Sequence, residues 1–221
     1  MTRELVKFLQ TIGVDTRFVS IMEDKVYINN LKFSRFSRKK EELFKKSFTE
    51  VDVIRSKIFQ KICMRASRNL AHCIHPKERI FLIKNDDPRN FALHIILEPY
   101  QRKYGIELIF GESMDETENL DIDSVAMPLT LDDEAQNILQ LMLNGEKIGL
   151  LSSNESYNDI KLVYPLINVP NSWIYSWTQN TTDNELNQDE SAEDLLKFLE
   201  SLVPDVRENL LKSALFISRG C

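Results

Sequence analysis

Two adjacent carboxylates, Asp132 and Asp133, follow the strand-like segment 123–128 and begin a helical pattern. Ligands of open α/β sheets bind at the carboxyl ends of strands, and carboxylate oxygens suit Mg²⁺, so the pair could hold the ion beside a nucleotide. The same acids also suit a helix start. Thr130 is a good N-cap residue and Asp133 completes a capping box, while Gly145 fits the position after the last turn.

The loop at 83–90, IKNDDPRN, is the first strand end at which a phosphate could bind. A phosphate cradle needs glycines, so that backbone N–H groups can approach the oxygens, and usually a hydroxyl or a lysine. The loop has no Gly, Ser or Thr, and its Asp86 and Asp87 repel a polyphosphate. The residues therefore argue against a phosphate cradle here.

Metal and nucleophile sites are weakly supported. His72, Cys73 and His75 are close in sequence but lack the distant second ligand pair of a zinc site, so a cluster at a helix end is the preferred interpretation. No Ser/His/Asp or Cys/His set follows from the spacing. We therefore expect no catalytic residue, no metal and no cofactor in this chain.

A dense cationic run occupies residues 32–46, where phenylalanines alternate with the charges. It could form a solvated helix face, with Glu41 and Glu42 pairing with neighbouring lysines, or it could contact nucleic acid. We predict contacts to an RNA backbone. The residues predicted to make them are Lys32, Arg35, Arg38, Lys39, Lys40, Lys45 and Lys46.

Composition places these residues in a globular protein with two unlike parts. The 221 residues are 43% hydrophobic and 28% charged, which provides a sizeable core and a polar surface. Residues 1–80 carry 18 Lys and Arg against 9 Asp and Glu, whereas the remainder carries 10 against 25. Such asymmetry suggests two faces with different partners.

Location and membrane association can be predicted from the same composition. Three irregularly spaced cysteines argue against a disulfide framework and for a reducing compartment. The N-terminus lacks the apolar stretch of a signal peptide, and no run is long enough to span a membrane. We expect a cytoplasmic protein with no membrane partner.

The hydrophobic pattern predicts an α/β domain with a mainly parallel sheet flanked by helices. A short helix at 2–12 and a hairpin turning at Glu23–Asp24 come first, and a helical region then runs from about 34 to 71 with a break near 47–53. Helices are predicted at 88–105, near 171–177 and in two C-terminal segments, with Pro204 near the first turn of the last. The predicted strands are 79–83, 106–112, 123–128 and, as a fourth, 147–153.

This order divides the chain into four predicted parts. Residues 1–50 form an N-terminal β-hairpin and basic-helix module, and residues 51–177 form the α/β domain. The polar, aperiodic stretch 178–191 is a linker, and residues 192–221 are C-terminal helices.

The order of features resembles the PP-loop ATP pyrophosphatases that modify tRNA, and most of all the cytoplasmic tRNA 2-thiolation proteins. The resemblance rests on ERIFLIKNDDPRN, KYGIELIF, DIDSVAMPLTLDDEAQNILQLMLNGE, VYPLINVP and PDVRENLLKSALFIS. In active members an SGGxDS loop holds the ATP phosphates, and a later helix opens with Asp-Asp followed by alanine. Asp132, Asp133 and Ala135 match that helix start.

The departure lies at the SGGxDS position, which residues 85–90 occupy with Asn-Asp-Asp-Pro-Arg-Asn. The second subunit of the cytoplasmic thiolase is often degenerate in this way and pairs with a catalytic subunit. Its N-terminus is similar in layout, with a zinc ribbon before a basic helix. Ile28 and Leu31 stand where a CxxC pair is expected, which implies that the zinc is lost.

The resemblance implies a non-catalytic partner subunit of a tRNA wobble-uridine 2-thiolation complex, which forms a heterodimer with a catalytic paralogue and binds tRNA. Asp132 and Asp133 would then be a vestigial nucleotide site. Two alternatives stay open. One is a divergent nucleotide-dependent tRNA-adenylating enzyme that uses both aspartates through Mg²⁺, and the other is a protein–protein scaffold without an RNA role.

Overall fold

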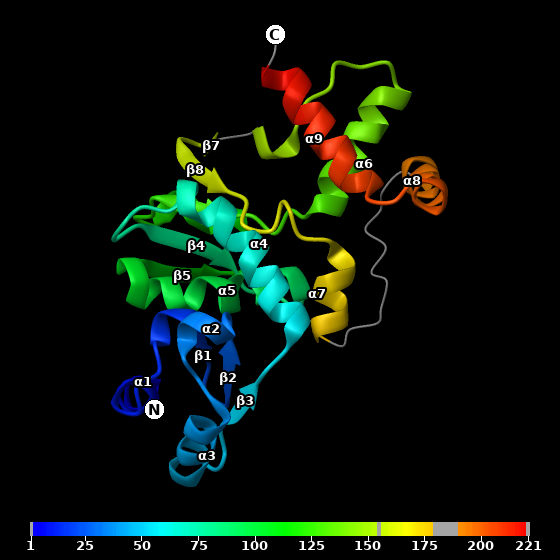
Figure 1. Cartoon of the computed structure of the whole chain (residues 1–221). Helices are drawn as coiled ribbons and strands as arrows, with labels where there is room; N and C mark the ends of the chain where they lie inside the picture. The colour runs from blue at the N-terminus through cyan, green and yellow to red at the C-terminus, as the bar shows by residue number, and fades with distance from the viewer. Residues whose placement is uncertain (1, 154–155, 179–189, 220–221) are drawn as a thin grey trace.

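The computed structural model describes residues 2–153, 156–178 and 190–219. The N-terminal module lies at one end of the molecule, the large parallel sheet in the middle and a group of helices at the other end (Figure 1). This arrangement follows the chain order from blue to red.

The N-terminal module contains a three-stranded sheet. Its helix α1 (Thr2–Thr11) and 3₁₀ turn η1 (Thr16–Phe18) precede strand β1 (Val19–Ile21), which pairs antiparallel with β2 (Lys25–Ile28) as the hairpin predicts. Two short helices, α2 (Leu31–Ser34) and α3 (Arg38–Ser47), follow, and strand β3 (Asp52–Ile54) then pairs parallel to β2. This third strand lies in the break that was predicted within the helical region, and its three residues are too few to show a strand pattern.

The module has its own apolar core. Leu5, Leu9, Ile28, Phe36 and Phe44 are each 0% exposed and pack together. Ile28 is therefore a core residue at one of the two positions where the resemblance leads one to expect a zinc-binding cysteine. Leu31 is exposed instead and begins α2. The module is thus held by apolar contacts.

The larger sheet has the strand order β5-β4-β6-β8-β7 and is parallel except for the edge pair β7–β8. The strands β4 (Arg79–Ile83), β5 (Glu107–Gly111) and β6 (Ser124–Ala126) agree with the sequence prediction. The predicted strand at 147–153 is wrong. Leu151–Ser153 is a 3₁₀ turn, η3, and the fourth parallel strand is β8 (Ile160–Val163), which follows the two-residue β7 (Ser156–Tyr157).

Helices cover this sheet and close its core. The packed layer consists of α4 (Lys57–Cys73), α5 (Pro88–Tyr104) and α7 (Asn171–Thr178), whose apolar residues share one cluster with β4, β6 and β8. Trp173 and Trp177 of α7 pack against that cluster. Gly105 ends α5 with a φ of 69°, a left-handed conformation that glycine adopts without strain.

The C-terminal part packs on a different helix. After the 3₁₀ turn η2 (Met114–Asn119) and β6, helix α6 (Leu131–Leu143) contacts both α8 (Glu190–Leu202) and α9 (Val206–Arg219). Pro204 lies before the start of α9 rather than in its first turn, because Asp205 has a positive φ of 56°. Most of the predicted linker at 178–191 falls outside the described residues.

A proline inside α5 leaves a helix carbonyl available for a hydrogen bond from the N-terminal module. Pro99 has no N–H, so the carbonyl of Ile95, four residues earlier, loses its helical partner. The hydroxyl of Ser20 in β1 donates to that carbonyl. One turn away the buried Glu98 accepts a bond of 2.9 Å from the N–H of Ile21, and Arg102 donates to the carbonyl of Val19 at 2.7 Å. The two parts are therefore joined by buried polar contacts as well as by apolar packing.

Among the described residues no helix is long and apolar enough to cross a membrane.

Candidate functional site

The loop between β4 and α5 reaches the carboxyl edge of the parallel sheet, where doubly wound folds bind ligands. Asn85 Oδ1 accepts bonds from the N–H of Asp87 at 3.1 Å and from Asn90 Nδ2 at 2.8 Å. Asp87 is the N-cap of α5 and accepts from the N–H of Arg89 at 2.8 Å. The start of α5, which attracts anions through its N–H groups and dipole, thus already carries a carboxylate of the chain itself.

Arg89 joins this loop to α6 through two ion pairs. Its guanidinium bonds Asp87 Oδ2 through Nη2 at 2.7 Å and reaches Asp133 Oδ1 through Nη1 at 3.4 Å. Its burial opposes the charged form, but the bond to Asp87 and the charge of Asp133 raise the pKa of Arg89 above its ordinary value. The side chain therefore stays charged in the crevice.

Asp133 has the capping role that the sequence predicts. Its Oδ2 accepts from the N–H and the hydroxyl of Thr130, both at 2.7 Å, and Thr130 Oγ1 accepts from the N–H of Asp133 at 3.5 Å. Both residues are buried. This is a complete capping box with Asp in the third position.

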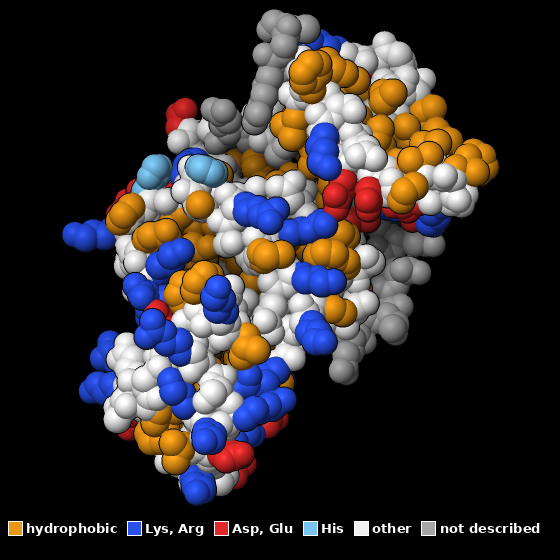
Figure 2. Space-filling view, in the orientation of Figure 1, with side chains coloured by type: hydrophobic (Ala, Val, Ile, Leu, Met, Phe, Trp, Pro, Cys, Tyr) orange, Lys and Arg blue, Asp and Glu red, His pale blue; other side chains and the backbone are white. Residues whose placement is uncertain are grey.

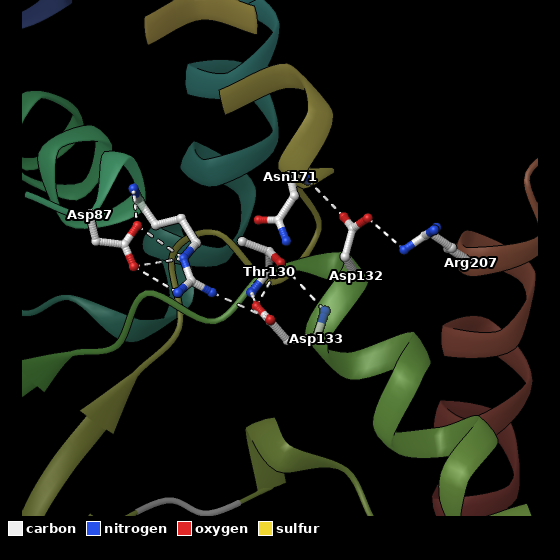
Figure 3. A network of polar contacts seen from close by, with 7 residues as sticks. Asp87, Thr130, Asp132, Asp133, Asn171 and Arg207 are labelled. Atoms are coloured by element: carbon white, nitrogen blue, oxygen red, sulfur yellow. Dashed lines mark hydrogen bonds and ion pairs between the residues drawn. The ribbon is translucent and has the colours of Figure 1, made fainter. Parts of the chain in front are cut away.

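The side chain of Asp132 points away from that of Asp133 and bonds residues of two other helices, α7 and α9 (Figure 3). It accepts from the N–H of Asn171, the first residue of α7, at 2.7 Å and from Arg207 of α9 at 2.6 Å. Arg207 also bonds Glu200 of α8 at 2.6 Å. Burial raises the pKa of Asp132, against the opposing effect of Arg207 and of the Asn171 N–H.

The two aspartates thus have separate partners and do not converge on one point. Asp133 lines a cavity of about 400 Å³ together with Arg89, and Asp132 does not. The buried Gln136 lines the same cavity, and its Nε2 has no hydrogen-bond partner among the described residues. The arrangement offers polar groups to a small ligand but few backbone donors to a polyphosphate.

Glu134, the third acid of α6, is fully buried, at 0% exposure. Its Oε1 accepts from the hydroxyl of Ser152 at 3.2 Å, and Oε2 has no partner in the part of the chain that the structure describes. Burial raises the pKa of Glu134, so its proton binds more tightly than in an exposed glutamate.

The structure separates the cationic residues of the run at 32–46 into those with a partner in the chain and those without one among the described residues. Lys40 Nζ donates to the carbonyl of Gly13, Lys45 pairs with Asp52 at 2.8 Å, and Arg38 pairs with Glu41 at 3.2 Å. The remaining four form no ion pair with any described residue and are exposed. They are Lys32, Arg35, Lys39 and Lys46.

The structure adds a second row of cations that the sequence prediction missed. Lys57, Lys61, Arg65 and Arg68 recur along α4 at three- and four-residue spacings, which places them on one side of the helix. Lys and Arg side chains gather over α4 and the N-terminal module on one face of the molecule (Figure 2). Their helical spacing is visible in the sequence, but their position beside the N-terminal run depends on how α4 packs.

The cluster of His72, Cys73 and His75 lies at and after the end of α4. No group of three His, Cys, Asp or Glu side chains within residues 2–153, 156–178 and 190–219 could hold a metal ion. Cys63 is buried in the main core, and burial raises the pKa of its thiol far above the ordinary range, which disfavours the reactive thiolate.

Comparison with known proteins supports the architecture. Over 109 residues the chain is 31% identical to a probable sulfurtransferase from Methanocaldococcus jannaschii. The match covers 48% of this chain and 31% of that protein, so the chain spans less than a third of the length of the sulfurtransferase. No protein-family model matches the chain.

A solved structure extends the comparison to most of the chain. The U34-tRNA thiolase NcsA from Methanococcus maripaludis, determined with its [4Fe-4S] cluster, superposes with a TM-score of 0.54 over 78% of this chain and 83% of its own. The two chains share a fold. At 11% identity the match concerns architecture alone, and it confirms the predicted PP-loop-like α/β fold with a mainly parallel sheet flanked by helices.

Proposed function

We propose that this chain is a non-catalytic partner subunit of a tRNA wobble-uridine 2-thiolation system in the cytoplasm, where it supports a catalytic paralogue and helps to bind tRNA. One observation carries the proposal. The Asp87 carboxylate caps α5 and is clamped by Arg89, so the chain's own charges fill the position in which an active member would hold phosphate. Asp132 and Asp133 are the remainder of a nucleotide site that now holds helices together.

The likeness to a U34-tRNA thiolase and to a probable sulfurtransferase supports the thiolation part of the proposal. The tRNA role is supported by the cations of the N-terminal module that form no ion pair with a described residue and by Lys57, Lys61 and Arg68 of α4 (Figure 2). Arg65 of the same row pairs with Glu208 of α9 at 2.6 Å. Phosphate contacts from Lys and Arg give affinity that falls with salt and depends little on sequence. Discrimination among tRNAs would then come from RNA shape and from the partner.

The partner role is supported by apolar side chains left exposed on the C-terminal helices. Hydrophobic atoms crowd the surface over this part of the molecule (Figure 2). Large exposed patches of this kind mark interaction surfaces. The exposed residues on α8 and α9 and between them are Phe198, Leu202, Val203, Phe216 and Ile217. We assign this face, named the C-terminal apolar face, to the catalytic paralogue.

The test is complementation of cells that lack the chain, with wobble 2-thiouridine as the readout. The double variant Asp132→Asn, Asp133→Asn keeps the shape of both side chains and removes the charge that a Mg²⁺ site needs. It should restore thiolation, provided that it folds. Leu202→Glu should abolish both thiolation and co-purification of the paralogue.

Two outcomes contradict the proposal. A double aspartate-to-asparagine variant that folds stably but restores no thiolation would favour a catalytic role for the carboxylates. Full thiolation in cells without the chain would exclude any role in the pathway. Phe110→Glu, which changes an exposed phenylalanine outside the C-terminal apolar face, is the control for surface charge.

The alternative, a divergent nucleotide-dependent enzyme, draws on the cavity beside Asp133. Its volume of about 400 Å³ accommodates a small ligand. The buried Gln136 Nε2, which has no partner in the described part of the chain, is a donor that such a ligand could satisfy. Adenosine monophosphate distinguishes the enzyme from the non-catalytic subunit, because it carries the base of a nucleotide without the polyphosphate that Asp87 would repel. Its binding here, abolished by Gln136→Leu, would favour the enzyme.

A further inference from the structure

A second cavity lies between the N-terminal sheet and the loop that follows β4. It has a volume of about 710 Å³, and it is lined by the strands β2 and β3, the start of α4, the β4–α5 loop and the end of α7. Pro88 and Phe91 form its wall on the α5 side, and Trp177 contributes from α7. The cavity depends on the docking of the N-terminal module, because Lys25 and Tyr27 of β2 also line it.

Three aromatic rings are stacked at this cavity. Phe59 lies under Trp177, with ring centroids 4.5 Å apart and an interplanar angle of 23°. Trp177 in turn lies against Phe91 at 5.8 Å and 18°. Tyr27 meets both Phe59 and Trp177 from the side, at 5.6 Å and 5.7 Å, and fixes their position.

The stack is open at one end. Phe59 is completely buried, whereas Phe91 is 41% exposed although Trp177 covers one of its faces. Trp177 is the one aromatic neighbour of Phe91 among the described residues, so the opposite face of the Phe91 ring is the surface on which a further flat ring could continue the stack. Nucleobases stack on exposed aromatic side chains in this way, whatever their sequence, because every base has a π-face.

Polar groups around the open end can bond a base, and two lysines near it suit the phosphate. Asn85 uses its Oδ1 within the loop, and its Nδ2 forms no hydrogen bond with the described residues. Asp86 and Ser176 add a carboxylate and a hydroxyl to the wall. Lys25 lines the cavity, and Lys57 follows Ser56, another lining residue, at the start of the α4 row.

We propose that this cavity receives one unpaired nucleotide of a bound RNA, with the base stacked on Phe91 and the backbone passing over Lys25 and Lys57. The inference rests on the proposed tRNA role, because the RNA must first lie along the cationic face. It adds a recognition element that phosphate contacts do not provide, since a base inside a duplex cannot reach the ring. Unpaired bases are the usual target of such stacking in RNA recognition.

The experiment uses the full chain with Trp173→Phe, which leaves Trp177 as the single tryptophan of a sequence that has two. Its fluorescence is recorded during titration with a single-stranded RNA decamer and with the same decamer annealed to its complement. We expect the single strand to quench Trp177 and the duplex to leave it unchanged. Phe91→Leu should remove the quenching and weaken single-strand binding roughly tenfold, as expected for loss of one base–aromatic stack. Phe91→Tyr should restore both.

Phe110→Leu is the matched control, because Phe110 is also 41% exposed but lies in β5, outside the cavity. Equal quenching by single strand and duplex, or unchanged binding by Phe91→Leu, overturns the inference. The same variants are titrated with tRNA over a salt series to test the proposed function separately. Salt-dependent tRNA binding that Phe91→Leu does not alter leaves the function standing without the stacking site. Quenching by the decamer without tRNA binding leaves the site standing without the function.

Discussion

At the residue scale, Arg89 links two acidic residues that lie far apart in the sequence. Its guanidinium joins Asp87 in its own loop to Asp133, which lies 44 residues further along the chain than Arg89. The side chains of Arg89 and Asp133 are 10% and 7% exposed. A buried ion pair contributes little net stability, but removing one partner leaves the other charge unpaired at high cost. We therefore expect Arg89 to contribute to the stability of the fold through these two ion pairs.

Arg89→Met tests this view, since methionine fills similar space without charge. Two largely buried carboxylates lose their partner, so the free energy of unfolding should fall by about 3–5 kcal/mol in urea titrations at neutral pH. Adding Asp87→Asn and Asp133→Asn should recover most of the loss. An equal loss in Arg17→Met, an exposed arginine paired with Asp15, would show that the network is not responsible.

Glu134 gives a pH dependence of stability with a definite sign. Because burial raises its pKa in the folded chain, the folded state binds this proton more tightly than the unfolded state does. The resulting stability is complete below the ordinary glutamate pKa of about 4.3 and is lost as pH rises through the higher folded pKa. The shift of Asp132 acts in the same direction.

Glu134→Gln removes the first of these contributions. Relative to the parent chain, its free energy of unfolding should increase as pH rises above about 4.3. Urea titrations at a series of pH values measure the difference, with the exposed Glu23→Gln as control. A difference that stays constant across this range would contradict the assignment to Glu134.

At the scale of elements, the contact between β1 and α5 holds the N-terminal module in place. Because Pro99 has no N–H, the carbonyl of Ile95 has no hydrogen-bond donor within the helix. The buried hydroxyl of Ser20 donates to it instead. A buried acceptor without a partner costs about 1–3 kcal/mol. The second cavity, which the N-terminal module helps to enclose, depends on this contact.

Ser20→Ala should therefore lower the free energy of unfolding by about 1–3 kcal/mol. The control is Ser67→Ala, in which an exposed hydroxyl bonds a carbonyl of its own helix at 3.0 Å. Thermal unfolding followed by circular dichroism compares the two. Equal losses of stability in both variants would mean that water can take the place of the Ser20 hydroxyl as donor to the Ile95 carbonyl.

The elements that could be predicted from the sequence are those with a strong local pattern. Helix α6 is the best case, since Thr130, Asp133 and Gly145 define its ends and all three have the predicted roles. Strands β3 and β8 were missed because three or four residues hold no periodicity, and pairing with a neighbour creates them. Nothing local indicates that Arg89 meets Asp133 or that Phe91 meets Trp177, because tertiary packing makes both contacts.

At the scale of the whole molecule, charge separates two surfaces. The cations of α3 and α4 share one face with the N-terminal module, and the C-terminal helices present apolar side chains (Figure 2). This division explains the net charge of −6 in a chain that we assign to RNA binding, because the acidic excess lies after residue 80. Steering of RNA depends on the local field rather than on net charge.

Charge reversal tests the cationic face. Lys39→Glu with Lys46→Glu changes two exposed lysines that have no ion pair among the described residues. The slope of log affinity for tRNA against log salt should become shallower by roughly 1.4–1.8, the value for two phosphate contacts. Lys77→Glu with Lys147→Glu makes the same change in net charge elsewhere and should alter the slope little. Equal slopes in both variants would show that the α3 lysines face solvent and do not contact the RNA backbone.

The central claim is that the Asp87 carboxylate, held by Arg89, blocks the start of α5 to a nucleotide phosphate. Calorimetry of the purified full chain with ATP and Mg²⁺ tests it most directly. The structure predicts no binding heat up to a nucleotide concentration of about 1 mM, because the Asp87 carboxylate covers the helix start and repels the γ-phosphate. Saturable binding with a Kd below about 10 µM, or about 7 kcal/mol of binding free energy, would contradict the claim and favour the enzyme.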